Sequence, residues 1–217
     1  MLRADLHIHT ADSMDSTTSV EQVVARCLEI GINCVAVTDH GAVANALRLK
    51  SMAPFPVIVG EEILTPHGEI MGLFLTERVP SPLPAQEAVA RIKAQGGLVC
   101  IPHPFDRLRG SALGGRMVEM LLPEIDIIEV FNSRTHLLRD LARALSFAQS
   151  HGLAASAGSD AHTPGEIGRA YVEMPQFNGR DEFLQSLAQG RIVGRRSSPL
   201  VHLSGLLARL RKRLGRT

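Results

Sequence analysis

The sequence is poor in cysteine and has no long apolar run. Its three cysteines, Cys27, Cys34 and Cys100, are an odd number without the paired spacing of a disulfide framework, which favours reduced thiols in a reducing compartment. Residues 1–7 lack the apolar core of a secretory signal peptide. No uninterrupted apolar run approaches the roughly 18 residues that a membrane-spanning helix needs. These absences predict a cytoplasmic protein without a membrane span.

Acidic side chains are missing from residues 203–217. This segment carries only basic charges, on Arg209, Arg211, Lys212, Arg213 and Arg216. Because the whole chain has a net charge of +1, the remainder is mildly acidic, at −4. A nucleic-acid-binding protein usually carries many positive charges spread over its surface. The main part of this chain is mildly acidic instead, so no dedicated nucleic-acid-binding surface is expected. The leucines of the segment follow helical spacing. They predict a basic C-terminal helix that packs its apolar stripe on the main domain, residues 1–202, with a membrane-surface or nucleic-acid contact as the alternative.

Three common functional motifs are also absent. The sequence contains no Walker loop and no Gly-x-Gly-x-x-Gly, so no nucleotide cofactor is implied. Gly158-Ser159-Asp160 is not the Gly-x-Ser-x-Gly turn of a serine hydrolase, and nothing supports a serine triad.

The chain itself repeats one order of elements. At 217 residues and 45% hydrophobic, it fits a single domain with a full core. Three segments run from a helix through glycine into a short apolar strand and then a polar cluster, around residues 29–40, 95–103 and 150–162, and a fourth strand ends at Asn132. Further helices are predicted at 85–95, 136–150 and 180–189. Alternating strands and helices predict an α/β fold, here of barrel type.

The polar clusters all fall at the carboxyl ends of predicted strands. Residues i and i+2 of a strand point to the same side, so His7 and His9 present two imidazoles together, and Asp160 and His162 share that spacing. Imidazole with carboxylate suits zinc, manganese or iron. One such pair is more often structural than functional. Four clusters at strand ends instead indicate a metal site, because a β/α barrel gathers its functional residues there.

Taken together, these motifs resemble the PHP family, named after DNA polymerase and histidinol phosphatase. The matching segments, in the family's order, are Asp5–Thr10, Val37–Gly41, Gly60–Ile63, Ile101–Pro104, Glu129–Asn132 and Gly158–His162. The resemblance implies a distorted seven-stranded β/α barrel that binds two or three divalent metal ions, of zinc, manganese or iron.

The resemblance also implies the ligands. One ion would take His7, His9, Glu62 and Asp160. A second would share Glu62 as a bridge and add His103, with Asn132 standing where several members have a histidine, so that this ion would be held less tightly. A third would use His40, His162 and Asp15. Glu62 is preferred to Glu61 because it directly precedes the apolar Ile63, and strand alternation then points Glu61 away from the site.

The implied reaction is metal-dependent hydrolysis of a phosphomonoester or small phosphodiester, of nucleotide or amino-alcohol type, by metal-activated water. His103 and His162 are candidates to protonate the leaving group. Arg134, two residues after Asn132, is the candidate for holding phosphate, since a guanidinium binds phosphate through two parallel hydrogen bonds. The expected partner is a small phosphorylated metabolite or an oligonucleotide end.

Two other functions stay open. Amidohydrolases also begin with His-x-His in a barrel, but they need a bridging lysine, and Lys50, Lys93 and Lys212 all fall on predicted helices. A metal-stabilised binding or regulatory module without catalysis is the second alternative.

Overall fold

The computed structural model describes residues 1–214, with the side chains of 202–204 and 206 left out. Its backbone forms nine strands, and seven α-helices are described. The strands are β1 Leu2–Ile8, β2 Cys34–Val37, β3 Val57–Thr65, β4 Gly68–Leu73, β5 Leu98–Ile101, β6 Ile127–Asn132, β7 Ala154–Gly158, β8 Ala170–Met174 and β9 Arg191–Gly194. The helices are α1 Val20–Ile30, α2 Ala44–Met52, α3 Ala85–Ala94, α4 Gly115–Leu121, α5 Leu138–His151, α6 Gly179–Ala188 and α7 Val201–Leu214, with short 3₁₀ turns η1 Leu122–Glu124 and η2 Pro164–Glu166.

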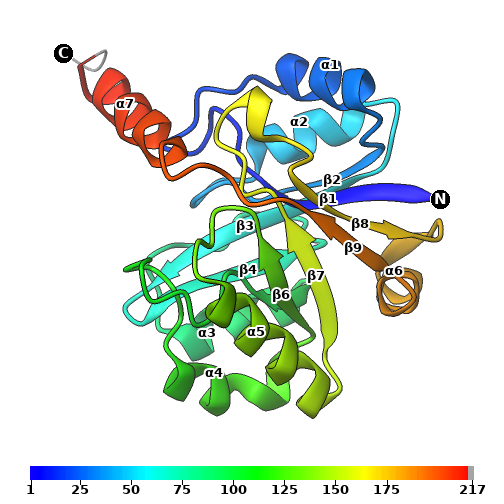
Figure 1. The fold of residues 1–217 in the computed structure, drawn as a ribbon, viewed down its shortest axis with the longest axis vertical. Coiled ribbons are helices and arrows are strands. Elements are labelled where there is room, and N and C mark those ends of the chain that lie inside the picture. Colours follow the sequence, from blue (N-terminus) through cyan, green and yellow to red (C-terminus); the bar gives the residue numbers. More distant parts are fainter. Residues whose placement is uncertain (215–217) are drawn as a thin grey trace.

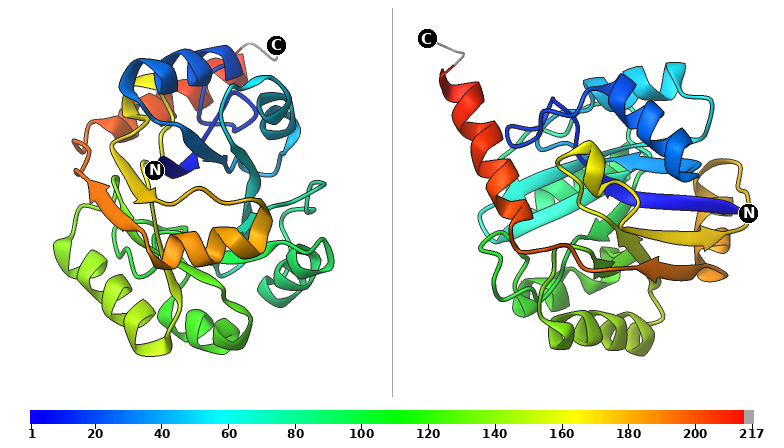
Figure 2. Two further views of the ribbon diagram at one scale, coloured as in Figure 1. Left: turned by 90° about the vertical axis from the view of Figure 1, so that its right-hand side faces the viewer. Right: turned by 45° about the horizontal axis from the view of Figure 1, so that its top comes forward.

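All nine strands belong to one curled sheet, in the order β7-β6-β5-β4-β3-β2-β1-β8-β9 (Figure 1). The end of β1 is hydrogen-bonded to the segment that follows β7. The N–H of Asp160 donates to the carbonyl of His7 at 2.8 Å, and the N–H of His9 donates to the carbonyl of Ala161 at 2.9 Å. The result is a nearly closed barrel, with helices α1 to α5 around its outside (Figure 2). The predicted barrel class is therefore confirmed.

The strand count differs from the predicted seven. The chain between β2 and β5 forms an antiparallel hairpin of β3 and β4, and β8 and β9 pair antiparallel beside β1. Short polar links such as Thr65–Gly68 reverse the chain directly, whereas a parallel pair needs a longer crossover. The barrel is thus mixed, with the parallel pairs β1–β2, β2–β3, β5–β6 and β6–β7.

Two apolar layers hold the strands in place. The inner layer fills the barrel with residues such as Leu6, Met71 and Ile127, and α6 closes it with Phe183 and Leu187. An outer layer lies between the strands and the helices that cover them. Strands β2 to β5 are buried on both faces almost throughout, so their residues form short apolar runs in the sequence. The open end of the barrel, where these strands finish, is where the polar residues gather.

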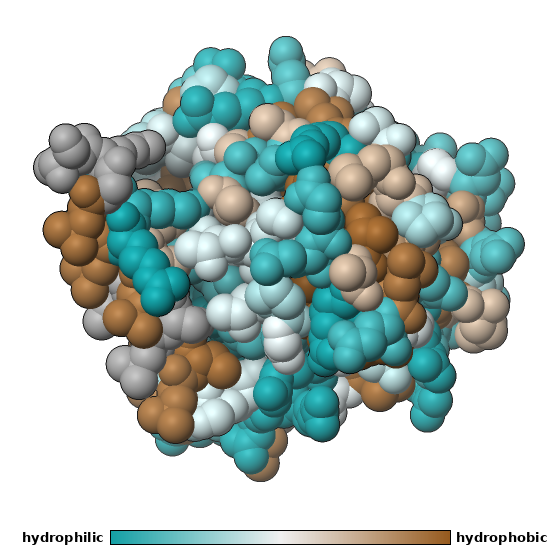
Figure 3. All heavy atoms as spheres, turned by 90° about the horizontal axis from the view of Figure 1, so that it is seen from above, coloured by the Kyte–Doolittle hydropathy of each residue, from teal (hydrophilic) through white to brown (hydrophobic). Residues whose placement is uncertain are grey.

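Part of the leucine stripe predicted for the C-terminal helix α7 is exposed. The helix begins at Val201, and its leucines 207, 210 and 214 are exposed, as the apolar side chains at the left of Figure 3 illustrate. Two of its basic side chains reach the barrel, because Lys212 Nζ donates to the carbonyls of Ala11, at 2.6 Å, and Ser13, and Arg209 Nη2 donates to Asp15, whereas Arg211 and Arg213 are exposed. The side chains of the predicted stripe residues 203 and 206, and Arg216, lie outside the described part of the chain. Among the described residues, no helix is both long and apolar enough to cross a membrane.

Candidate metal centre

The polar residues that follow the strands meet at one end of the barrel. His7 lies next to the last residue of β1 with His9 just beyond the strand, Glu62 lies on β3, and Asp160 follows β7. The nine side chains predicted as metal ligands lie in this region, and all are buried except the partly exposed His40. They are His7, His9, Asp15, His40, Glu62, His103, Asn132, Asp160 and His162.

Four of these side chains surround a single point. His7 Nε2 and His9 Nε2 lie 3.1 Å apart, and each is 3.4 Å from Glu62 Oε2. Asp160 Oδ1 lies 3.4 Å from His9 Nε2 and 3.8 Å from His7 Nε2. A tetrahedral zinc-like ion with bonds of about 2 Å separates its ligand atoms by roughly 3.3 Å. The spacing of the His7, His9 and Glu62 atoms therefore fits one such ion, and Asp160 Oδ1 lies close to both histidine nitrogens.

The carboxylate oxygens that face this point have no hydrogen-bond donor. Glu62 Oε2 and Asp160 Oδ1 are buried without a hydrogen-bond partner in the described residues, and so are Asp15 Oδ1 and Glu69 Oε2. Leaving a charged oxygen buried and unpaired costs several kcal/mol, roughly, unless a cation lies against it. The donor set and its unpaired oxygens thus fit a group of divalent cations.

Glu62 reaches a second group of ligands through its other oxygen. Its Oε1 lies 2.9 Å from His103 Nε2, and that nitrogen lies 3.6 Å from Glu69 Oε2. Glu69 also approaches His40, at 3.7 Å from Nδ1. It was not among the predicted ligands, because only the antiparallel pairing of β3 with β4 brings it beside Glu62. Its neighbour Glu61 points to the opposite side of β3, as strand alternation predicts.

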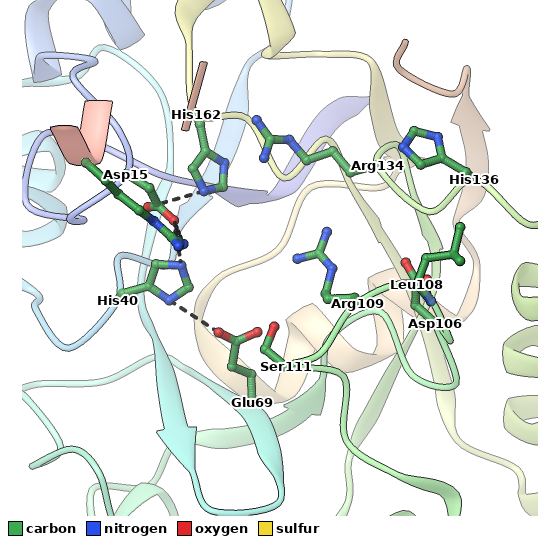
Figure 4. A pocket seen from close by; sticks show the side chains of 11 residues that line it. Asp15, His40, Glu69, Asp106, Leu108, Arg109, Ser111, Arg134, His136 and His162 are labelled. Carbon is green, nitrogen blue, oxygen red and sulfur yellow. Dashed lines mark hydrogen bonds and ion pairs between the residues drawn. The ribbon is translucent and has the colours of Figure 1, made fainter. Parts of the chain in front are cut away.

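A third group opens onto the solvent side of the centre. His162 Nε2 lies 3.3 Å from Asp15 Oδ1, and His40 Nε2 lies 3.6 Å from Asp15 Oδ2. Ring nitrogens of His9, His40 and His162 all lie within 4.8 Å of one another. From α7, Arg209 Nη2 approaches Asp15 Oδ2 at 2.7 Å. Figure 4 shows Asp15, His40 and His162 along one wall of a pocket of about 220 Å³.

Further buried groups orient the histidines from behind. His7 Nδ1 lies 3.0 Å from Glu129 Oε1. His9 Nδ1 lies 3.0 Å from the hydroxyl of Ser13, which in turn donates to Asp39 at 2.8 Å. With Nδ1 engaged in this way, both rings turn Nε2 toward the shared point. Glu129 lies in a segment that matches the family pattern, whereas nothing in the sequence distinguishes Ser13.

Asn132 lies beside the ligands but turns its oxygen away from them. Its amide nitrogen donates to Glu129 Oε2 at 2.9 Å and to Asp160 Oδ2 at 3.2 Å, while its Oδ1 accepts the backbone N–H of Arg134 at 2.9 Å. In this arrangement Asn132 offsets negative charge through hydrogen bonds rather than offering an oxygen to a metal ion.

The predicted phosphate-binding residue, Arg134, is largely occupied by another partner. Its Nε and Nη2 donate to Glu166 at 2.9 and 2.7 Å, and its side chain is 5% exposed. It still lines the pocket, with Arg109 nearby (Figure 4). Arg109 Nη2 donates to Asp160 Oδ2 at 2.6 Å, which leaves its other nitrogens toward the pocket. Arg109 is therefore the more open of the two guanidinium groups.

At this centre Asp160 and Glu62 are held ionised and His9 neutral, while the pKa of His7 and of His40 is raised because the neighbouring carboxylates outweigh the effect of burial. Burial raises the pKa of Asp160, but Arg109 outweighs it and holds the pKa well below its usual range. Burial likewise opposes ionisation of Glu62, while the charge of His7 lowers the pKa well below normal. Burial lowers the pKa of His9 to about 3, so its ring is neutral near pH 7. Ionised carboxylates and a neutral imidazole are the forms that ligate metal ions.

The backbone at the centre is also unusual. His103 and Asp160 adopt left-handed conformations, with φ of 32° and 53°, although neither is glycine. Such conformations are costly and cluster at functional sites. Gly158 comes so close to β1 that an added Cβ would lie 2.3 Å from the Cβ of His7. Only glycine permits this approach of β7 to the first ligand.

The fold and the site together define a β/α-barrel protein with a cluster of divalent-metal ligands at the ends of its strands. Sequence models agree with that class: the PHP domain matches residues 5–79, and the PHP-associated region matches residues 139–192. The chain belongs to the PHP family.

Individual relatives extend this likeness. The uncharacterised protein MJ0417 of Methanocaldococcus jannaschii is 36% identical over 180 residues, covering 82% of this chain and 72% of that protein. A 3′,5′-nucleoside bisphosphate phosphatase of Chromobacterium violaceum is 37% identical over 91 residues, 39% of this chain and 30% of that enzyme. A two-domain protein of Bacteroides vulgatus, containing a predicted PHP-like metal-dependent phosphoesterase, shares the fold with a TM-score of 0.74 at 17% identity. The alignment covers 89% of this chain and 65% of that one.

Proposed function

We propose that this protein is a phosphoesterase that hydrolyses a phosphomonoester or small phosphodiester with two or three divalent metal ions. One observation carries the proposal: buried carboxylate oxygens without donors converge with histidine Nε2 atoms at distances that fit a shared ion. His7, His9, Glu62 and Asp160 would hold one ion, Glu62 and His103 a second with Glu69, and His40, His162 and Asp15 a third. Bound ions of this kind neutralise phosphate charge and make water a stronger nucleophile near neutral pH.

The chain's own cations would bind the substrate phosphate. Arg109 and Arg209 lie on different sides of the pocket, and each already contacts one ligand carboxylate. Arg134 adds its remaining nitrogen, since Glu166 occupies the other two. Guanidinium groups suit phosphate because their donors match its oxygens in pairs. These three arginines would therefore orient the phosphoester against the ligand cluster.

A proton for the leaving oxygen would come from a histidine. His162 lines the pocket, and its Nδ1 is hydrogen-bonded at 2.9 Å to the carbonyl of Asp160, which fixes the ring. His103 is more deeply placed, with Nδ1 buried and without a partner in the described residues. Because only His162 opens to the pocket, it is the better placed of the two candidates.

The pocket suits a small phosphorylated group. Its volume of about 220 Å³ lies below the range of roughly 300–1,000 Å³ that encloses a drug-sized ligand. A phosphate with part of its leaving group would fill it, so a nucleotide or another small phosphorylated metabolite, or the end of an oligonucleotide, fits. The partial likeness to a nucleoside bisphosphate phosphatase favours a nucleotide phosphate.

An amidohydrolase would need a bridging lysine at the metal centre, and none of the three lysines lies among the ligands described above. Lys93 Nζ pairs with Asp126 at 2.6 Å, and Lys212 contacts the carbonyls of Ala11 and Ser13. Lys50 lies near the end of α2.

The proposal is tested by metal analysis combined with hydrolysis of an aryl phosphate. Protein purified without chelator should contain two or three equivalents of zinc, manganese or iron and turn the substrate over. His9→Ala and Asp160→Ala should lose metal and activity together, while His67→Ala, on an exposed turn, should lose neither. Activity that survives in both ligand variants with unchanged metal content would contradict the proposal. Full metal content without turnover of any phosphoester would favour a binding module.

A further inference from the structure

A second concave surface lies apart from the metal centre, on the flank of the barrel between α1 and the antiparallel pair β8 and β9. It is a groove of about 340 Å³, and it shares no lining residue with the pocket described above. The guanidinium groups of Arg3, Arg26, Arg169 and Arg195 line it, and no acidic residue does. We call this surface the arginine groove.

The positive charge of the arginine groove is only partly balanced. Arg26 pairs with Glu29 at 2.8 Å, but that carboxylate is 67% exposed, and Arg3 approaches Glu173 at 3.5 Å. Exposed pairs of this kind contribute little, because water screens them. Arg169 and Arg195 have no carboxylate partner in residues 1–214 as described. Four like charges around one hollow repel each other, so an anion bound between them would be stabilised.

Two donors in the groove are buried and unpaired. The Nε atoms of Arg26 and Arg169 have no hydrogen-bond partner among the described residues. An unmade hydrogen bond to a buried charged group is expensive, roughly 1–3 kcal/mol or more. Both residues line the same hollow, so a small rotation of each side chain would bring its Nε to an oxygen-rich ligand bound there.

An apolar wall adjoins these charges. It consists of Ile30 and Ile32 beside the ring of Tyr171. Gly168 brings the start of β8 against this wall, since its φ is +80° and an added Cβ would lie 2.6 Å from Ile30 Cδ1. Arg3 lies over the tyrosine ring, 6.0 Å from its centroid. The groove therefore offers guanidinium donors and apolar surface side by side.

We propose that the arginine groove is a second binding site, for the phosphate group of a small organic ligand. Arg26 and Arg169 would bind the phosphate oxygens, with Arg3 and Arg195 adding charge, because guanidinium donors match phosphate in pairs. The apolar wall would take the organic part. The site is independent of the proposed hydrolytic function, since it includes none of the metal ligands or pocket arginines.

The test titrates two phosphonates that cannot be hydrolysed, phenylphosphonate and methylphosphonate, into metal-loaded protein labelled with ¹⁵N. The Nε–H resonances of Arg26 and Arg169, assigned through Arg→Lys variants, should shift and saturate. The shifts should persist in Arg109→Gln protein, in which the metal-site pocket is weakened. Phenylphosphonate should bind more tightly than methylphosphonate because of its ring.

Paired substitutions provide the control. The double variant Arg26→Gln/Arg169→Gln, followed through the backbone amide resonance of Gly168 in the same groove, should weaken phenylphosphonate binding at this site about tenfold or more. Arg91→Gln/Arg180→Gln, which removes the same charge from exposed ion pairs elsewhere, should leave it unchanged. Aryl phosphate hydrolysis should be unaffected in both. The site would be overturned if the wild-type resonances did not shift, or if Arg109→Gln abolished the shifts. Equal affinity for the two phosphonates would overturn the role of the apolar wall.

Discussion

A single hydrogen bond decides which nitrogen of His7 faces the metal centre. Because Glu129 lies 3.0 Å from Nδ1, the ring turns Nε2 toward Glu62 and Asp160. The other oxygen of Glu129 accepts the backbone N–H of His103 at 2.7 Å. One buried carboxylate thus positions ligands from two strands.

Replacing Glu129 by Gln should weaken metal binding without removing a ligand. Loss of the charge behind His7 makes its ring a poorer ligand, and substitutions at such positions lower metal affinity roughly 10- to 100-fold. Competition with a chromophoric chelator measures the change. Glu124→Gln, on an exposed turn, is the matched control. Unchanged affinity in Glu129→Gln would show that the hydrogen bond has no influence on the centre.

On the opposite side of β3, Glu61 gives a pH-dependent prediction. Burial raises its pKa from 4.5 to about 7, although its Oε2 accepts the N–H of Val79 at 2.7 Å. The unfolded chain therefore loses this proton first, so the free energy of unfolding should fall as pH rises from about 4.5 to about 7 and then level off.

Glu61→Gln should remove that dependence, because the amide oxygen can still accept from Val79. Its advantage over wild type should grow between about pH 5 and about pH 8, reaching roughly 2 kcal/mol. Urea unfolding at both pH values measures this, with exposed Glu77→Gln as the control. An advantage that is the same at both pH values would contradict the raised pKa.

At the scale of elements, two units bring distant sequence to the centre. The β3–β4 hairpin supplies Glu62 from one strand and Glu69 from the other. Helix α7 brings Arg209 back to Asp15, which follows β1 at the other end of the sequence. The helix lies outside both family matches, which end at residue 192.

Arg209→Gln should raise KM for an aryl phosphate severalfold, up to about tenfold, with kcat little changed, because it removes a charge that binds phosphate at the pocket rim. Steady-state kinetics measure both constants. Arg213→Gln, exposed on the same helix, is the control. Equal KM values in the two variants would show that α7 takes no part in substrate binding.

At the scale of the whole molecule, the closed barrel buries every cysteine. Cys27, Cys34 and Cys100 are fully buried free thiols, and burial raises the pKa of Cys27 and Cys34 to about 12. The thiolate is the reactive form, so these cysteines should be inert in the native protein.

Native protein at mildly alkaline pH should therefore resist thiol labelling, and all three cysteines should react after unfolding. Mass spectrometry after alkylation counts the modified residues. Labelling in the native state at a rate above that of global unfolding would contradict the burial of the three thiols.

The sequence by itself determined the alternation of strands and helices and the strand-end position of the histidines, because both follow from local periodicity. The family resemblance indicated Glu62 over Glu61, and alternation along one strand, which is a local rule, then placed Glu61 on the other side. Only the tertiary structure decided that Glu69 and Arg209 lie at the centre and that Glu166 forms an ion pair with Arg134. Those contacts connect segments far apart in the chain, and their geometry depends on a hairpin pairing and on the packing of a terminal helix, which no local pattern encodes.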